Sequence, residues 1–390
     1  MPTRHRLLAS LVSLALVSPA FAQCGIGDIT GDGVIDGADL GYVLGAWGSN
    51  DTNADFDSND IVDGADLGLL LGNWGTVDVA AGSFPDEWIW GNPNCAIDPQ
   101  IQVHQFNANT FILRQSLCTN FEGPFIYLLF GQDKVLMEDT GASNIALYTT
   151  VKSIIDQWLL ANRKTSIQLI VSHSHAHGDH VFNDSQFAGK PNTTVVGTSL
   201  TAVKNFFGIP NWPNQIVDYD LGGRVVTVIP IPGHHTAHIA FYDHQTGLLL
   251  TGDTLYPGRL YISQWAPYKA SIQRLVDYTA DKPLCWVLGT HIEMSSTPGV
   301  DFPLGSTSHP NEHELQLTRE HLLELNAAII AMGPSPAYQV HDDFIIFPLV
   351  LALDNPCPDA SPRMPDDEAM CMCRPKTVFE YRKLREALAK

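Results

Sequence analysis

Positive charge is scarce in this chain of 390 residues, which has 22 Lys and Arg against 42 Asp and Glu and a formal net charge of −20. Between Arg6 and Arg114 there is no Lys or Arg at all. A surface that follows nucleic-acid phosphates needs clustered basic side chains, so the composition argues against nucleic acid as a partner. The hydrophobic content of 45% is enough for a sizeable core, in two domains or in one large domain with appendages.

A hydrophobic run long enough to cross a membrane is also missing, since the apolar stretch from Leu7 to Val17 falls well short of the roughly 20 residues required. Arg4 and Arg6 precede this stretch and Ala20-Phe21-Ala22 follows it, which is the pattern of a secretory signal peptide. We therefore predict that residues 1–22 are a signal peptide, with a membrane anchor as the alternative that the short run disfavours. The mature chain is expected to be secreted or attached to the cell surface, without a membrane span.

Cysteine is sparse, with seven residues and no Cys-x-x-Cys pair, so no zinc site is inferred from the cysteines. An exported chain can form disulfides, and the odd count leaves at least one thiol or an intermolecular bond. The pattern leaves the pairing open.

A duplicated, aspartate-rich segment follows the predicted signal peptide, with residues 28–48 and 55–75 repeating at a spacing of 27. Each copy places oxygen ligands at the alternating positions of a calcium loop. In the first copy these are Asp28, Thr30, Asp32, the carbonyl of Val34, Asp36 and Asp39. In the second copy they are Asp55, Asp57, Asn59, the carbonyl of Ile61, Asp63 and Asp66. The segment is therefore predicted to bind two Ca²⁺ and to fold only with them, because unpaired carboxylates repel one another.

A short helix is predicted after each loop, since Leu40, Leu44 and Trp47 recur at helical spacing and their counterparts do so in the second copy. Asp60 stands where the loop pattern expects Gly. An acidic, disordered linker is the alternative. The arrangement resembles a type I dockerin over about residues 24–76. That resemblance implies a small all-α calcium-binding domain over residues 23–78 that docks onto a cohesin-like scaffold or cell-surface protein.

Strand and helix patterns alternate from residue 79 to about residue 345, which predicts an α/β catalytic domain. Residues 125–130 and 135–137 are expected to form a hairpin. Further strands are predicted at 167–171, 194–197, 224–231, 238–242, 247–252 and 285–288. Helices are predicted near 144–162, 199–207, 268–279 and 311–332.

A histidine-rich motif, Ser172-His-Ser-His-Ala-His-Gly-Asp-His180, directly follows the strand predicted at 167–171. Counting from His175 gives His-x-His-x-Asp-His, whereas counting from His173 puts His177 where the Asp should be, so the first frame is preferred. Two imidazoles separated by one residue can reach one cation, while the next Asp and His turn toward a second. Alone, such a loop could be an incidental metal patch.

Three more candidate ligands follow in order, each at the end of a predicted strand: His234 in Pro-Gly-His, Asp253 in Thr-Gly-Asp and His291 in Gly-Thr-His. Loops at one edge of a sheet converge, which brings ligands that are distant in sequence into one site. Any one of these residues alone could be structural. Four elements in the right order predict a metal centre.

The complete set resembles the metallo-β-lactamase fold superfamily of dinuclear hydrolases over most of residues 100–295. The resemblance implies an αββα sandwich of two β-sheets flanked by helices. It also implies that His175, His177 and His234 hold the first metal ion, that Asp179, His180 and His291 hold the second, and that Asp253 bridges both. Asp139-Thr140-Gly141 resembles the family's turn that supports the ligands, with an ordinary strand end as the alternative.

Two close cations would hold a bridging hydroxide near neutral pH that attacks a carbonyl group, and Asp179 could orient that hydroxide. Zinc suits the imidazole-rich first site, and the carboxylates would also accept iron or manganese. The sequence thus predicts a secreted dinuclear metallohydrolase that acts on a small ester, lactone or thioester.

Individual residues bear on which branch of the superfamily the chain resembles. A β-lactamase would be expected to carry Cys or Ser in place of Asp253, and glutathione thioesters are cytosolic, which argues against glyoxalase II in an exported protein. Tyr256 resembles the tyrosine with which lactonases assist the substrate carbonyl, with a packed strand-end tyrosine as the alternative. His238 could support the ligands or contact substrate. Four further histidines are expected to lie outside the chemistry, namely His173, His235, His244 and His309.

Two alternatives stay open: a persulfide dioxygenase-like mononuclear iron enzyme, and a noncatalytic calcium-dependent attachment protein whose metal centre is vestigial. The complete set of candidate ligands argues against a vestigial centre, because a site that had lost its function would be expected to lack at least one ligand. Residues 346–390 are predicted to be a C-terminal extension, which could cap the cleft or pack on the sheet edge.

Overall fold

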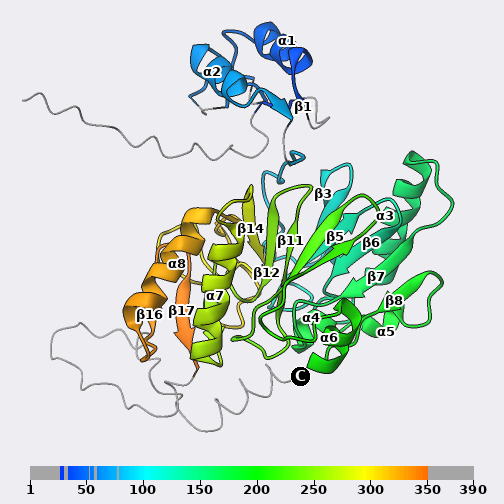
Figure 1. The fold of residues 1–390 in the computed structure, drawn as a ribbon, viewed down its shortest axis with the longest axis vertical. Helices are drawn as coiled ribbons and strands as arrows, with labels where there is room; N and C mark the ends of the chain where they lie inside the picture. The colour runs from blue at the N-terminus through cyan, green and yellow to red at the C-terminus, as the bar shows by residue number, and fades with distance from the viewer. Residues whose placement is uncertain (1–26, 30–33, 52, 57–58, 77–78, 350–390) are drawn as a thin grey trace, which may run out of the picture.

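The computed structural model describes residues 27–29, 34–51, 53–56, 59–76 and 79–349, which form a small N-terminal helical segment and a larger body of sheets and helices (Figure 1). The predicted signal peptide and the residues after 349 lie outside the described part. In the described residues, no helix combines the length and the apolarity that crossing a bilayer requires.

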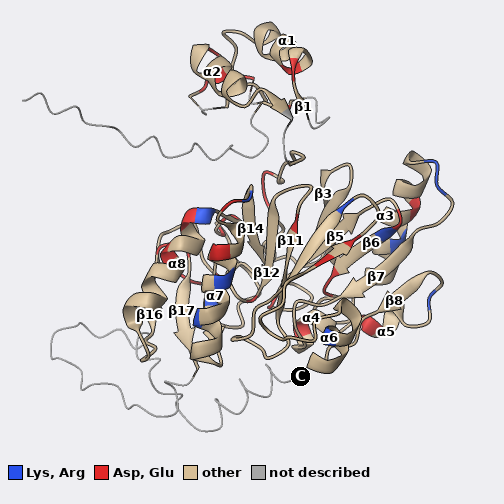
Figure 2. Ribbon diagram, viewed as in Figure 1, with Lys and Arg blue, Asp and Glu red and all other residues tan. Residues whose placement is uncertain are grey.

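The N-terminal segment contains two helices, α1 (Gly37–Gly45) and α2 (Gly64–Gly72). Each begins after an aspartate, Asp36 or Asp63, that caps the first amide groups and is capped in return by the aspartate three residues later. A small apolar core, Ile35, Val43, Ala54, Val62 and Leu70, joins them. The segment was predicted as all-α, and the structure adds an antiparallel pair of two-residue strands, β1 (Val34–Ile35) and β2 (Gly75–Thr76). The charged groups drawn on this segment are all acidic (Figure 2).

The first large sheet of the body has six strands in sequential order, and the pairs are antiparallel up to β6 and parallel beyond it. Its strands are β3 (Ile101–Asn107), β4 (Thr110–Gln115), β5 (Phe125–Phe130), β6 (Lys134–Glu138), β7 (Gln168–Ser172) and β8 (Thr193–Val195). The helices that follow its strands along the chain are α3 (Leu147–Ala161), α4 (Gly178–Val181), α5 (Asp184–Phe187) and α6 (Leu200–Phe207). The hairpin predicted over 125–137 is confirmed as β5 and β6.

The second large sheet has the order β15-β14-β12-β11-β10-β9. Its strands are β9 (Val217–Asp220), β10 (Val225–Pro230), β11 (Ile239–Asp243), β12 (Leu248–Gly252), β14 (Trp286–Gly289) and β15 (Gln316–Leu317). A separate small sheet joins β13 (Arg259–Ile262), β17 (Ile345–Pro348) and β16 (Gln339–Val340). The last helices are α7 (Trp265–Thr279) and α8 (Arg319–Met332).

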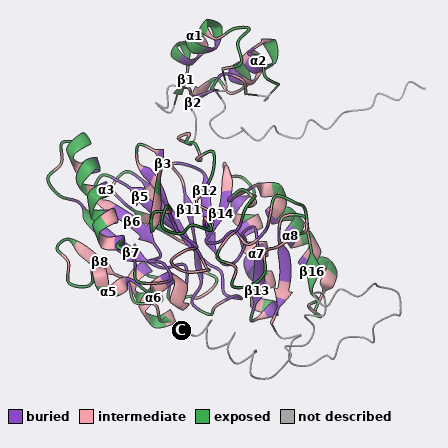
Figure 3. Ribbon diagram, turned by 180° about the vertical axis from the view of Figure 1, so that it is seen from behind, coloured by how far each residue is buried: buried purple, intermediate pink, exposed green. Residues whose placement is uncertain are grey.

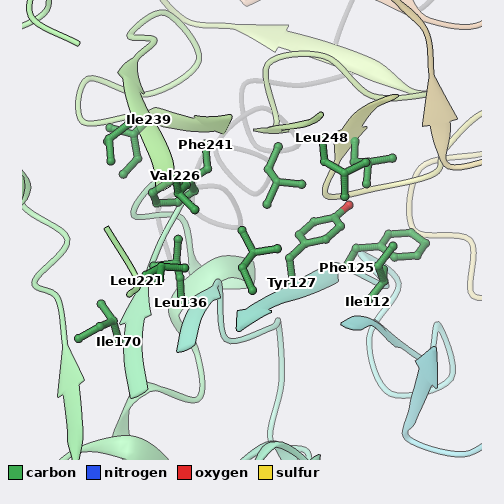
Figure 4. Close-up of a cluster of buried hydrophobic side chains, with 14 of the residues drawn as sticks. Ile112, Phe125, Tyr127, Leu136, Ile170, Leu221, Val226, Ile239, Phe241 and Leu248 are labelled. Atoms are coloured by element: carbon green, nitrogen blue, oxygen red, sulfur yellow. The ribbon is translucent and has the colours of Figure 1, made fainter. Parts of the chain in front are cut away.

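The two large sheets pack face to face around one apolar cluster, to which both contribute alternating side chains such as Tyr127 and Leu136 from one and Val226 and Phe241 from the other (Figure 4). A second cluster fills the space between the first sheet and α3, and a third joins the second sheet to α7 and α8. The central strands of the two large sheets are buried, while the outer faces of helices such as α3 are exposed (Figure 3). The predicted αββα sandwich is therefore confirmed.

The start of one predicted helix was wrong. The helix predicted at 311–332 begins only at Arg319, because Thr318 caps its first turn and the preceding residues include β15. The division at residue 345 falls at the start of β17, which pairs with β13 and belongs to the body. The hairpin of β3 and β4 was not predicted.

Candidate metal centre

All seven candidate ligands lie just beyond the ends of strands or in the short helix that follows β7. His175 and His177 come after β7, Asp179 and His180 lie in α4, and the other three follow β10, β12 and β14. The two sheets thus each deliver ligands to the same end of the sandwich. The structure brings these seven side chains together in two groups that share Asp253.

The first group consists of His175, His177, His234 and Asp253. Its nitrogens lie close together: His175 Nε2 is 2.8 Å from His177 Nδ1, and His234 Nε2 is 3.1 Å from His175 Nε2 and 3.0 Å from His177 Nδ1. Asp253 Oδ2 lies 3.4 Å from His234 Nε2 and 3.7 Å from His175 Nε2. Atoms about 2.0 to 2.1 Å from one tetrahedral zinc lie about 3.3 Å apart, so this spacing fits one ion.

The second group consists of Asp179, His180, Asp253 and His291. Asp179 Oδ2 lies 3.1 Å from His180 Nε2 and 3.2 Å from His291 Nε2. The other oxygen of Asp253, Oδ1, lies 3.4 Å from His180 Nε2 and 3.3 Å from His291 Nε2. Each oxygen of Asp253 therefore faces a different group, which is the arrangement that a bridging carboxylate requires.

Two buried atoms of the second group, His180 Nε2 and Asp253 Oδ1, make no well-aligned hydrogen bond within the described part of the chain, although they lie 3.4 Å from each other. A buried polar atom without a partner is costly, so such atoms point to a ligand. The donors are four imidazoles and a carboxylate in buried positions, with the half-buried His177 and Asp179 at the accessible side. Imidazole nitrogens and carboxylate oxygens suit zinc, and the residues present fit two such ions.

Outer hydrogen bonds fix the orientation of the ligand rings. His180 Nδ1 contacts Asp139 Oδ2 at 2.7 Å, and Asp139 also accepts from the Ser174 amide at 2.8 Å. His234 Nδ1 donates to the Tyr261 carbonyl at 2.7 Å, and His291 Nδ1 donates to the Glu122 carbonyl at 2.8 Å. Asp139 has a positive φ of 69°. The Asp-Thr-Gly turn thus supports the ligands, as the family resemblance implied.

Sequence reasoning missed Ser174, Tyr261 and Glu122. Ser174 Oγ contacts Asp139 and lies 3.1 Å from His175 Nδ1. Tyr261 and Glu122 act through backbone carbonyls, which any residue type supplies, so the sequence held no signal for them. Ser174 stands inside the motif and could have been considered as a partner of a neighbouring ring.

The two groups differ in their protonation. Burial, together with neighbouring imidazoles, lowers the pKa of His175 and lowers the pKa of His177 to about 3. Burial alone would lower the pKa of His180 and His291, but the carboxylates of Asp179 and Asp253 more than offset it and raise the pKa of both rings well above the usual value. The first group therefore presents neutral imidazoles, whereas the second holds protons that a metal ion must displace.

The remaining candidates lie around these groups. His173 Nε2 contacts Asp184 Oδ1 at 2.8 Å, outside both groups. Tyr256 is buried, and its hydroxyl donates to the Arg259 carbonyl, as a packed tyrosine would; the lactonase-like role stays a prediction that this hydrogen bond does not support. His238 is buried beside His175, with ring centroids 4.6 Å apart, and its Nε2 has no hydrogen-bond partner among the described residues.

The calcium loops are only partly described. Thr30, Asp32 and Asp57 lie outside the described residues. Asp28, Asp39 and Asp66 are buried, and Asp60 adopts a positive φ of 67°, the left-handed conformation that the expected Gly would supply. Asp55 accepts from the amides of Asn59 and Asp60 at 3.1 and 2.8 Å. Within the described ranges, only the two groups in the body cluster closely enough to hold an ion as they stand.

The sequence profile of the Metallo-beta-lactamase superfamily matches residues 120–333, which is more than half of the chain. The chain therefore belongs to this superfamily. The hydroxyacylglutathione hydrolase of Aeromonas hydrophila subsp. hydrophila is 35% identical over 106 residues, which cover 26% of this chain and 40% of that protein. The hydroxyacylglutathione hydrolase of Yersinia pestis (strain Pestoides F) is 31% identical over 170 residues, which cover 42% of this chain and 61% of that protein. The chain thus spans less than two thirds of the length of these relatives.

Among solved structures, a metallo-beta-lactamase from Pontibacter korlensis aligns with 59% of this chain and 99% of its own, at 16% sequence identity and a TM-score of 0.40.

Proposed function

We propose that this protein is a metal-dependent hydrolase that cleaves the carbonyl bond of an ester, a lactone or a thioester. The observation that carries the proposal is the sharing of Asp253 between two buried groups of ligand atoms, each spaced for one ion. A complete second group favours hydrolysis over mononuclear iron chemistry. The similarity to hydroxyacylglutathione hydrolases supports a thioester or a related acyl compound as substrate.

His175, His177 and His234 would hold one ion, and Asp179, His180 and His291 the other, with Asp253 between them. When bound, two such ions supply Lewis acidity toward a carbonyl oxygen and lower the pKa of water at the site. Asp179 would accept a hydrogen bond from the attacking water, because its carboxylate is the more exposed one, at 17% against 8% for Asp253. Burial opposes ionisation of Asp179, but His180 and His291 outweigh it and keep its pKa well below the usual value, so the group stays an acceptor.

The test is metal analysis of the purified protein together with hydrolysis assays on an ester, a lactone and a thioester. We expect about two zinc ions per chain and loss of hydrolysis on chelation. One iron per chain with oxygen consumption on a persulfide would replace the proposal with a dioxygenase. Full metal content without turnover of any of the three substrates would instead favour the noncatalytic attachment protein.

We also propose that the N-terminal segment binds calcium and attaches the exported enzyme to a scaffold or surface protein, as a dockerin-like module would. The positive φ of Asp60 in the second loop and the capping box at the start of each helix support this proposal. Equivalent residues of the two repeats are exposed, Leu44 with Leu71 at 54% and 51% and Trp47 with Trp74 at 48% each. Such a duplicated apolar pair favours a partner protein. The Cys95–Cys118 disulfide supports an oxidising compartment.

Calcium titration of the full chain tests this module. Trp47 and Trp74 should report binding by fluorescence, and a variant lacking residues 23–78 should show no response while retaining hydrolysis. An unchanged signal in the full chain, or loss of zinc from a folded deletion variant, would contradict the proposal.

A further inference from the structure

His235 lies beside the first ligand group without belonging to it. Its ring centroid is 5.3 Å from that of His177 and 5.8 Å from that of His175, and it is not among the grouped ligand atoms. Its side chain is half-buried, whereas His175 and His234 are buried. His235 therefore stands on the same accessible flank as His177, where a substrate would approach.

The structure also fixes which ring nitrogen carries the proton. The Ala237 amide lies 3.1 Å from His235 Nδ1 and can only donate, so Nδ1 accepts and the hydrogen resides on Nε2. The backbone holds this turn closed, because the His235 carbonyl accepts from the amides of Gly233 and His238 at 3.4 and 3.3 Å. In the described part of the chain Nε2 makes no hydrogen bond. The result is an oriented N–H donor that faces no protein acceptor.

Contrary to the expectation from the sequence, we propose that His235 is a further catalytic residue whose Nε2–H donates to the carbonyl oxygen of the substrate as that oxygen gains negative charge. The inference rests on the proposed hydrolytic function and adds a side chain to it. A donor placed where charge develops stabilises the transition state more than the ground state. The donor does not depend on titration, since Nε2 carries its hydrogen in both the neutral and the protonated ring.

The step balances without proton transfer at His235. As the water oxygen bonds to the carbonyl carbon, the π electron pair moves to the carbonyl oxygen, and the Nε2–H bond to that oxygen shortens. When this electron pair re-forms the carbonyl bond, the bond between the carbonyl carbon and the alkoxide or thiolate breaks. The proton lost by the water ends on this leaving group. The hydrogen of Nε2 stays on the nitrogen throughout.

Two substitutions of His235 separate the effect of its hydrogen-bond donor from the effect of its ring shape. His235→Phe keeps a ring but removes the donor, and His235→Gln keeps an N–H at similar reach. On the best substrate of the ester, lactone and thioester panel, the Phe variant should lose on the order of a hundredfold in kcat with little change in KM. The Gln variant should retain most of the activity. His104→Phe, which replaces a half-buried histidine of β3, is the matched control and should leave kcat unchanged.

A binding measurement gives a second readout. A phosphonate analogue of the substrate presents a tetrahedral oxyanion, so its affinity for the Phe variant should fall by a factor similar to that in kcat, while zinc content stays at about two per chain. Equal kcat in wild type and Phe variant would overturn the inference, as would a loss of zinc that accounts for the lost activity. A wild type inactive on the whole panel would instead refute the hydrolytic function itself.

Discussion

Asp253 connects the two ligand groups, because each of its oxygens faces different imidazoles. Replacing it with alanine removes charge and geometry from both groups at once, and two divalent ions without a bridging carboxylate should no longer sit close together. We expect Asp253→Ala to lower zinc from about two per chain toward one or none and to reduce turnover by roughly a hundredfold or more. Metal analysis and hydrolysis of the best substrate measure the two effects.

His173→Ala is the control for this substitution. The residue is the extra histidine of the motif, and its ring is occupied by Asp184 at 2.8 Å. The variant should keep both zinc ions. If His173→Ala loses more zinc per chain than Asp253→Ala does, the assignment of ligands from His175 onward is wrong.

The unequal protonation of the two groups predicts the order in which metal is lost in acid. His180 and His291 have raised pKa values and bind protons readily, whereas His175, His177 and His234 have lowered ones. As the pH falls, protons therefore compete first for the second group, and its ion should leave at a higher pH than the first. Zinc per chain, measured from pH 8 to pH 4 against a chelator, should pass through a plateau at one.

Single substitutions show which ligand group loses its zinc in each of the two steps. His291→Ala should lack the step at higher pH, and His177→Ala should lack the step at lower pH. The reverse assignment would show that the protonation of the metal-free groups does not govern release.

Glu138 is a buried carboxyl group whose two oxygens have no hydrogen-bond partner in the part of the chain that the structure describes. Burial and then Asp139 raise its pKa well above the ordinary value of 4.5. The folded protein thus binds this proton more tightly than the unfolded chain, so the free energy of unfolding should fall as the pH rises from about 4.5 toward the folded pKa. Glu138→Gln should remove this decline, so that the variant gains more unfolding free energy over the wild type at pH 8 than at pH 5.

Urea unfolding of the metal-free wild type and variant at both pH values measures the difference. Asp156→Asn, on the exposed face of α3, is the control and should leave the pH dependence as it is. Parallel pH profiles for wild type and Glu138→Gln would contradict the assignment.

At the scale of elements, β17 joins the C-terminal part of the body to the metal centre. It pairs with β13, and the Tyr261 carbonyl of β13 accepts from His234. Ile346 is fully buried in the cluster beneath α7 and α8, so Ile346→Ala should cost about 2 to 5 kcal/mol of unfolding free energy and weaken zinc binding in the first group. Val340→Ala, at an exposed position of β16, should cost little. Equal losses of unfolding free energy in Ile346→Ala and Val340→Ala would contradict the role of β17 in the core.

The elements that sequence patterns predicted are those with strong local signals. The buried runs that became β5, β7, β10 and β12 and the amphipathic stretch of α3 needed no long-range information. The seven candidate ligands could be proposed from the sequence because each follows a predicted strand. What the sequence could not show is the pairing of β13 with β17, since a parallel ladder between distant segments carries no local pattern.

The start of α8 shows a second limit. The apolar spacing continues upstream of Thr318, so periodicity alone extended the helix to residue 311. The threonine cap, which accepts from the Glu320 amide, and His321, which accepts from the Thr318 amide, together mark the true start. Local hydrogen bonding therefore overrides the hydrophobic period at this end.

Across the whole molecule, acidic groups outnumber basic ones in a way that bears on substrate charge. The net charge is −20, and every charged side chain in residues 23–78 is aspartate. Asp and Glu residues occur throughout the body (Figure 2). Arg259, which follows Asp253 by six residues, already binds Glu293 at 2.9 Å and Asp301 at 2.6 Å. The long-range field should therefore repel an anionic substrate and slow its association.

Two thioesters with the same hydroxyacyl group test this field. One carries glutathione, as in the substrates named for the relatives, and the other carries uncharged N-acetylcysteamine. We expect kcat/KM at low salt to favour the uncharged thioester, and the preference to shrink as salt is raised to about 0.15 M, where the screening length is about 8 Å. Removing residues 23–78 should narrow the gap further without changing kcat on the uncharged compound. A salt-independent preference for the glutathione thioester would mean that a dedicated site for its charges overrides the field of the molecule.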